Sequence, residues 1–243
     1  MRSSNPVFNK RFADMSRSAT GGGTMSISGT IDKSVILFFL VLISASFTWN
    51  RFLDETVNIS GLMGLGLFGG LIFAVATIFK PNWAPITAPI YALLEGLFLG
   101  GISAQFNYMY PGLPFQAVGL TLAVLIVMLT LYRLRIIQVT EKLRSGIISA
   151  TMGVLLFYVA IWIAGMFGAN LGFMMDSSPL GIGLSLVIVG IAAFNLLLDF
   201  DFIERASAQG YPAYMNWVGA FGLMVTLVWL YLEILRLLGR LRD

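Results

Sequence analysis

The sequence predicts an all-α, multi-pass membrane protein with about seven transmembrane helices. Of the 243 residues, 58% are hydrophobic and only 11% are charged. Soluble domains average roughly 45–50% apolar and about 25% charged residues. One soluble core cannot bury this much apolar surface, so the surplus is expected to face lipid. The long apolar runs also lack the alternation that is typical of a barrel strand, which leaves helices as the spanning elements.

Seven apolar runs mark the expected helices, since a spanning helix needs about 20 such residues. The first run is the shortest and must extend into its flanks to span. Proline stands between or at the start of several runs, where a helix ends or begins. The runs cover Ser34–Trp49, Gly61–Phe79, Pro85–Phe106, Phe115–Tyr132, Gly146–Gly168, Pro179–Leu198 and Trp217–Leu238.

The first 33 residues are polar and contain Gly21-Gly22-Gly23. No apolar stretch precedes Ser34, as a cleaved signal peptide would require. We therefore predict a flexible N-terminal tail over residues 1–33 and a seven-helix membrane domain over residues 34–243. Glycine is concentrated in the expected second, third and fifth helices, where small residues allow close helix packing.

Basic residues predict a protein of the cell membrane with a cytoplasmic N-terminus, because Lys and Arg favour the inner side. In this orientation 11 of the 15 Lys and Arg residues are inside: five in the tail, then Lys80, Arg133, Arg135, Lys142, Arg144 and Arg205. The C-terminal arginines oppose this orientation, because seven full crossings place them outside. They are Arg236, Arg240 and Arg242.

Composition also narrows the function. The chain has no cysteine and no histidine, which excludes disulfides, thiol chemistry, zinc sites of the His or Cys kind and Ser-His-Asp triads. The net charge of +3 is too small to indicate a nucleic-acid partner. The Gly-x-Gly-Asp motif of intramembrane aspartyl proteases is missing. We expect a non-enzyme without a cofactor, whose first partner is the lipid bilayer.

Ionisable residues inside the expected helices are the candidate functional residues, since a charge at a helix centre costs roughly 2.5–3.5 kcal/mol on insertion scales. Glu95 lies about 15 Å along a helix that starts at Pro85, near the middle of the membrane. Asp199 follows Asn195 by one helical turn and shares its face. Asp201 is close enough to Arg205 along the helix to pair with it.

Glu233 lies in the last helix and has Arg236 one turn further on, so a helical salt bridge can neutralise it. Three stretches together carry a family resemblance: Asn195-Leu196-Leu197-Leu198-Asp199, Leu230-Tyr231-Leu232-Glu233-Ile234, and the glycine-rich helix from Glu95-Gly96 to Gly100-Gly101-Ile102-Ser103. Over residues 34–238 the sequence resembles the Bax inhibitor, or transmembrane Bax inhibitor motif, family, in its bacterial form.

The resemblance implies a fold in which six helices surround the seventh. It also implies a pH-sensitive calcium leak that is latched by two acids sharing a proton, which are Asp199 and Glu233 in this chain. Two close carboxylates cannot both ionise at low cost, so such a pair responds to pH. This chain departs from the family by having Glu rather than Asp in the last helix.

Helix lengths argue against that pair. If the sixth helix runs to Arg205 and the seventh starts at Pro212, Asp199 and Glu233 differ in depth by about 20 Å. Asp199 and Glu95 differ by only about 5 Å. Whether Asp199 pairs with Glu233 or with Glu95 therefore stays open.

The predicted function is a pH-sensitive cation leak channel, with calcium as the favoured permeant ion and metal partner. Its gate or ion pathway is expected to use Asp199, Glu233, Glu95 and the carboxamide of Asn195, because calcium prefers oxygen ligands. Secondary roles are expected for Asp201, Arg205 and Arg236. The alternative is a regulatory protein that binds a membrane protein partner, such as a protease or a component of a stress or cell-death pathway. A proton-coupled transporter is a third possibility.

Overall fold

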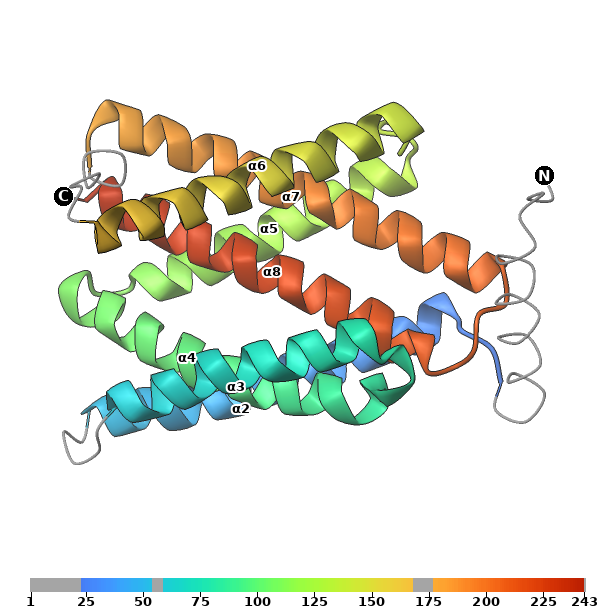
Figure 1. Cartoon of the computed structure of the whole chain (residues 1–243), viewed down its shortest axis with the longest axis horizontal. Coiled ribbons are helices and arrows are strands. Elements are labelled where there is room, and N and C mark those ends of the chain that lie inside the picture. Colours follow the sequence, from blue (N-terminus) through green and yellow to red (C-terminus); the bar gives the residue numbers. More distant parts are fainter. Residues whose placement is uncertain (1–22, 54–58, 168–176, 243) are drawn as a thin grey trace. The chain divides into compact units, whose positions relative to one another are not determined.

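A computed structural model describes residues 23–53, 59–167 and 177–242, which form seven long helices (Figure 1). All seven are long and apolar enough to cross a membrane, which confirms the predicted fold class. The helices are α2 (Ile27–Leu53), α3 (Ile59–Phe79), α4 (Ala84–Met109), α5 (Leu113–Arg133), α6 (Glu141–Met166), α7 (Pro179–Ala208) and α8 (Met215–Arg240), with a short 3₁₀ turn, η2 (Pro81–Trp83), before α4.

Most helices extend beyond the apolar runs that predicted them. Helix α2 begins at Ile27 rather than at Ser34, and α7 continues past Leu198 to Ala208. Helix α6 begins at Glu141, where the hydroxyl of Thr140 accepts a hydrogen bond from the backbone N–H of Leu143. The apolar run measures the lipid-facing part of a helix, and polar turns continue it into the interface. Residues 1–22 of the predicted tail lie outside the described residues.

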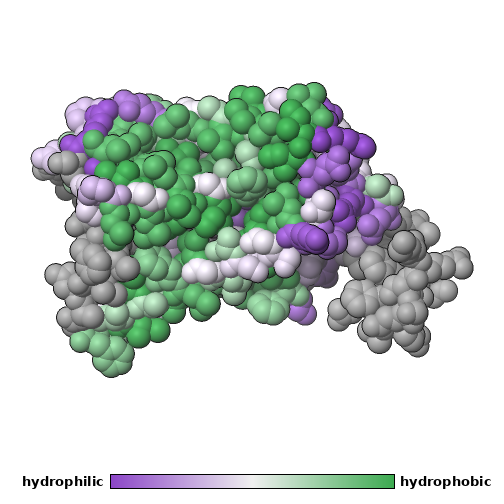
Figure 2. All heavy atoms as spheres, turned by 90° about the horizontal axis from the view of Figure 1, so that it is seen from above, coloured by the Kyte–Doolittle hydropathy of each residue, from purple (hydrophilic) through white to green (hydrophobic). Residues whose placement is uncertain are grey.

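Large apolar side chains cover the outside of the helices. Phe68 on α3, Ile126 on α5 and Leu156 on α6 are 66%, 64% and 63% exposed, respectively. Figure 2 shows hydrophobic residues over most of the face seen, with hydrophilic residues gathered toward its margins. Such exposure would be costly in water and is what a lipid environment requires.

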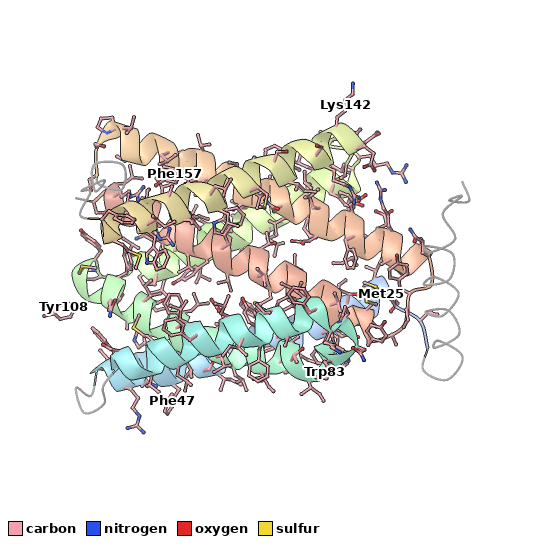
Figure 3. All side chains as sticks on the ribbon, in the orientation of Figure 1. Met25, Phe47, Trp83, Tyr108, Lys142 and Phe157 are labelled. Carbon is pink, nitrogen blue, oxygen red and sulfur yellow. The ribbon has the colours of Figure 1, made fainter. Side chains whose placement is uncertain are left out.

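The chain divides into two compact units, and α4, α7 and α8 each contribute to both. The first unit comprises Met1–Ile102 and Asp201–Met224, and the second comprises Ser103–Phe200 and Val225–Asp243. In the first unit, α2, α3 and the start of α4 run side by side (Figure 1). In the second, Tyr108 and Lys142 lie at opposite ends (Figure 3).

Glycines bring the helices of the first unit together, as their enrichment predicted. A Cβ at Gly66 on α3 would meet the Leu94 carbonyl oxygen at 2.5 Å and the Phe98 backbone nitrogen at 2.7 Å. On the other side of α4, a Cβ at Gly100 would collide with the backbone of Ala45 on α2. Helix α4 is therefore in backbone contact with both neighbours, which is possible only where no side chain intervenes.

The segment before α2 is fastened to the turn between α7 and α8. The backbone N–H of Met25 donates to the Tyr211 carbonyl over 2.6 Å. The side-chain oxygen of Asn216 accepts from the Ser26 N–H at 3.0 Å and from the Thr30 hydroxyl at 3.1 Å. Helix α2 is thus tied to the start of α8 within the first unit.

Helix α8 is the most buried of the seven. In its most apolar window 61% of the residues are buried, against 50% for the span containing α4 and 39% for α7. Its contacts reach α2 through Asn216, α4 through Tyr231 and Ser103, and α6 through Glu233 and Tyr158. The expectation that six helices surround the seventh stays a prediction.

Candidate functional site in the membrane helices

Asp199 lies inside α7, nine residues before the helix ends at Ala208. Its side chain is half-buried, and its Oδ2 oxygen is inaccessible and has no hydrogen-bond partner among the described residues. The side chain of Thr226 on α8 is hydrogen-bonded to the Asp199 carboxyl. Asp199 therefore faces the last helix, with one oxygen unsatisfied in an apolar interior.

Two contacts fix how α7 and α8 lie alongside each other in the second unit. Near the start of α7, Arg240 bonds to the hydroxyl of Ser185 and to the carbonyl of Gly181. Further along α7, Asp199 meets Thr226. Each helix advances by about 21 Å between the Arg240–Ser185 and the Asp199–Thr226 contacts. The two helices are therefore antiparallel neighbours with a constant register over this length.

Glu233 belongs to a different cluster from Asp199. It is 2% exposed, and its Oε1 oxygen accepts hydrogen bonds from Tyr158 on α6 at 2.9 Å, from Arg236 at 3.1 Å and from the indole of Trp229 at 3.3 Å. The predicted pairing of Glu233 with Arg236 is confirmed. Arg236 also donates to the Tyr158 hydroxyl over 3.0 Å, which closes a triangle of polar contacts.

The register of α7 and α8 separates the two acids of the family latch. Thr226, the residue level with Asp199, precedes Glu233 by two turns, or about 10 Å along α8. The predicted depth difference of about 20 Å had the right direction but was too large. The cause is the turn between the helices, because α8 starts at Met215 rather than at Pro212, and α7 continues beyond Arg205.

Asn195 shares the face of α7 that the sequence predicted, but its amide turns to α6. The amide nitrogen donates to the Thr151 hydroxyl at 2.8 Å and to the backbone carbonyl of Ile191 at 2.9 Å. Asn195 therefore joins α7 to α6, whereas Asp199 joins α7 to α8.

Asp201 lies in the first unit and has the local partner that the sequence predicted. Its Oδ1 oxygen accepts from Nε of Arg205 over 2.8 Å. Asp201 is buried and Arg205 is largely exposed, so the pair sits where α7 leaves the apolar layer. This acid is neutralised within its own helix, unlike Asp199.

Glu95 lies in the first unit, where α4 passes Gly70 of α3. A Cβ at Gly70 would lie 3.1 Å from the Oε2 oxygen of Glu95, so the glycine makes room for this carboxyl group. Tyr91, one turn earlier, is close enough to interact with it electrostatically. Glu95 makes no hydrogen bond or ion pair with any other described residue. The prediction that Glu95 lies close to Asp199 concerns residues of different units and stays a prediction.

A family model described as Bax inhibitor 1 like matches residues 5–243, nearly the whole chain. The chain belongs to the Bax inhibitor 1 like family. The resemblance predicted for residues 34–238 is thereby confirmed. The chain has no significant match among the curated proteins.

In this Bax inhibitor 1 like protein, no group of three or more His, Cys, Asp or Glu side chains gathers at one place within residues 23–53, 59–167 and 177–242. Glu95 rests over Gly70, and Glu233 is engaged by Tyr158 and Arg236. Calcium binding by Glu95, Asp199 and Glu233 stays a prediction. Each of these acids has its own neighbouring side chains.

The sequence did not predict the hydroxyl partners of the three candidate residues Asp199, Glu233 and Asn195. Thr226 meets Asp199, Tyr158 meets Glu233 and Thr151 meets Asn195. A signal was present for two of these residues. Thr226 lies two turns before Glu233 on α8, and Thr151 lies two turns before Tyr158 on α6, so each pair shares one helix face. Polar residues that recur on a face of an otherwise apolar helix indicate an internal contact.

Proposed function

We propose that this Bax inhibitor 1 like protein is a pH-sensitive cation leak, with calcium as the favoured ion and Asp199 as the titrating group of its gate. The supporting observation is the buried Oδ2 oxygen of Asp199, which lacks a hydrogen-bond partner among the described residues. Asp201 and Glu233, in contrast, each have a basic partner. Of these three acids, Asp199 is the one with no basic partner among the described residues.

A change in charge at Asp199 acts directly on the contact between α7 and α8. When protonated, the carboxyl group is neutral and remains with Thr226. When ionised, it places a charge in an apolar interior where one oxygen has no donor, and a buried uncompensated charge is expensive. Separation of the two helices, with entry of water or a cation, relieves that cost. Carboxylate oxygens are also the ligands that calcium prefers.

The sign of the pH response follows from this charge. Low pH keeps Asp199 neutral and the helices together, and high pH ionises it and opens the path. We therefore expect calcium flux into proteoliposomes to rise with pH. Asp199→Asn should remove most of the pH dependence, because the amide carries no charge at any pH.

The matched control is Asp201→Asn, which changes a nearby acid of the same helix that Arg205 already neutralises. Its pH profile should follow that of the wild type. Equal effects of the two substitutions would contradict the role of Asp199. A wild-type protein that carries no flux in pure lipid at any pH would contradict the leak and favour the regulatory alternative, which needs a partner.

A further inference from the structure

One face of α8 alternates between polar and apolar residues. Thr226, Leu230 and Glu233 follow one another at the spacing of a single helix face. Thr226 contacts Asp199, Glu233 contacts Tyr158, and Leu230 between them is fully buried, with 0% exposure. The two polar clusters on this face are thus separated by one layer of apolar side chain.

The side of α7 that faces α8 also carries a polar residue next to buried apolar residues. Asp199, Leu196 and Ala192 share one helix face, and both Leu196 and Ala192 are 0% exposed. The register set by the Arg240–Ser185 and Asp199–Thr226 contacts places Leu196 within one residue of the level of Leu230. It also places the small Ala192 level with Glu233.

The polar group closest to this layer is directed elsewhere. Asn195 precedes Leu196, but its amide is held by Thr151 on α6 and by the carbonyl of Ile191. The register therefore places two fully buried leucines, Leu196 and Leu230, at this level of α7 and α8.

We propose that Leu196 and Leu230 form the apolar barrier that closes the path between the Asp199–Thr226 pair and the Glu233 cluster. The proposal rests on the proposed cation leak and identifies the residues that close it. A hydrophobic constriction stops ions by excluding water, because an ion cannot shed its hydration shell there at low cost. A smaller side chain at either position admits water and weakens the barrier.

The test compares leucines that are equally buried but lie on different faces. Leu230→Ala is paired with Leu235→Ala, since both leucines are on α8 and 0% exposed, but Leu235 lies about 140° around the helix from Leu230. Leu196→Ala is paired with Leu197→Ala, the next residue, which is also 0% exposed. Each pair removes the same volume from the same helix.

Calcium flux into proteoliposomes is measured at low pH, where the wild-type leak is expected to be closed. Leu230→Ala and Leu196→Ala should raise this closed-state flux several-fold, and Leu235→Ala and Leu197→Ala should not. Similar flux in all four variants would overturn the barrier, because loosened packing alone would then explain the increase. Unchanged flux in Leu230→Ala and Leu196→Ala would overturn it as well.

A second measurement covers the case of an alanine variant that does not fold. The chain has no cysteine, so Leu230→Cys and Leu235→Cys each introduce a single thiol of intermediate volume. Leu230→Cys should react with a small water-soluble thiol reagent at high pH and be protected at low pH. Leu235→Cys should be protected at both. Equal reactivity at the two positions would overturn the barrier.

The two proposals fail in distinguishable ways. If the wild type carries no calcium at any pH, the leak itself is wrong. If the wild type shows pH-dependent flux while the matched variants behave alike, only the leucine barrier is wrong.

Discussion

Tyr158 and Glu233 connect α6 to α8 through a hydrogen bond of 2.9 Å from the phenol to the carboxylate. Arg236 donates to both of these oxygen atoms and lies over the Tyr158 ring, 5.6 Å from its centroid. The carboxylate of Glu233 is therefore compensated by a cation and by two neutral donors. This arrangement holds α6 and α8 together through Glu233.

Removal of the arginine should destabilise the protein strongly. Arg236→Gln leaves Glu233 buried without its cation, which costs about 3 kcal/mol, the lower end for a broken buried pair, because 35% of the Arg236 side chain is exposed. Unfolding by a denaturing detergent measures the change. The double variant Glu233→Gln with Arg236→Gln should recover part of the loss, because it no longer leaves a charge unpaired. A double variant less stable than the single one would contradict this account.

The pH profiles of three acid variants should separate the candidate pairs. Glu233→Gln is expected to leave the pH dependence of flux in place, since Glu233 is about 10 Å from Asp199 along α8 and has its own partners. Glu95→Gln is expected to reduce the pH dependence of flux, on the prediction that Glu95 is the neighbour of Asp199. The opposite result, a flat profile for Glu233→Gln and an intact one for Glu95→Gln, would support the two-acid latch of the family.

Close helix packing in the first unit can be tested with paired glycine substitutions. Gly100→Ala places a methyl group against the Ala45 backbone, which cannot move aside as a side chain can, and should lower stability by about 1–3 kcal/mol. Gly153→Ala on α6 meets nothing within 4 Å and should be neutral or slightly stabilising, because alanine favours helix. Melting in detergent compares the two. Equal losses of stability in the two variants would mean that helix propensity rather than packing determines the effect of the substitution.

Orientation can be tested at the two ends of the second unit. Lys142→Cys and Tyr108→Cys each place a single thiol at an exposed position at opposite ends of this unit. With a cytoplasmic N-terminus, an impermeant thiol reagent should label Tyr108→Cys in intact cells and leave Lys142→Cys unlabelled until the cells are opened. The reverse pattern would invert the protein in the membrane.

The C-terminal arginines that oppose this orientation all make contacts within the structure. Arg240 is bound to Ser185 and Gly181, and Arg242 donates to Gln116 on α5 over 3.2 Å. Arg236 is paired with Glu233.

The number of helices and the local ion pairs could be predicted from the sequence because both depend on residues close together in the chain. The Asp201–Arg205 and Glu233–Arg236 pairs are set by the helical repeat alone. The meeting of Asp199 with Thr226 instead depends on the register of α7 and α8. The two helices are joined by a turn in which Gly210 adopts a positive φ of 66° and Tyr211 accepts a bond from Met25. Gly210 and Pro212 indicate a turn, but no local pattern specifies contacts between residues far apart in the chain.

The contacts of α8 also bear on how the protein is made. Helix α8 carries Glu233 and Arg236 within a stretch that must enter the bilayer, where a charge costs roughly 2.5–3.5 kcal/mol at the helix centre. The groups that satisfy its polar side chains lie on α6 and α7, at Tyr158 and Ser185. Both residues are translated before α8. Contact with α6 and α7 therefore offsets part of the cost of placing α8 in the bilayer.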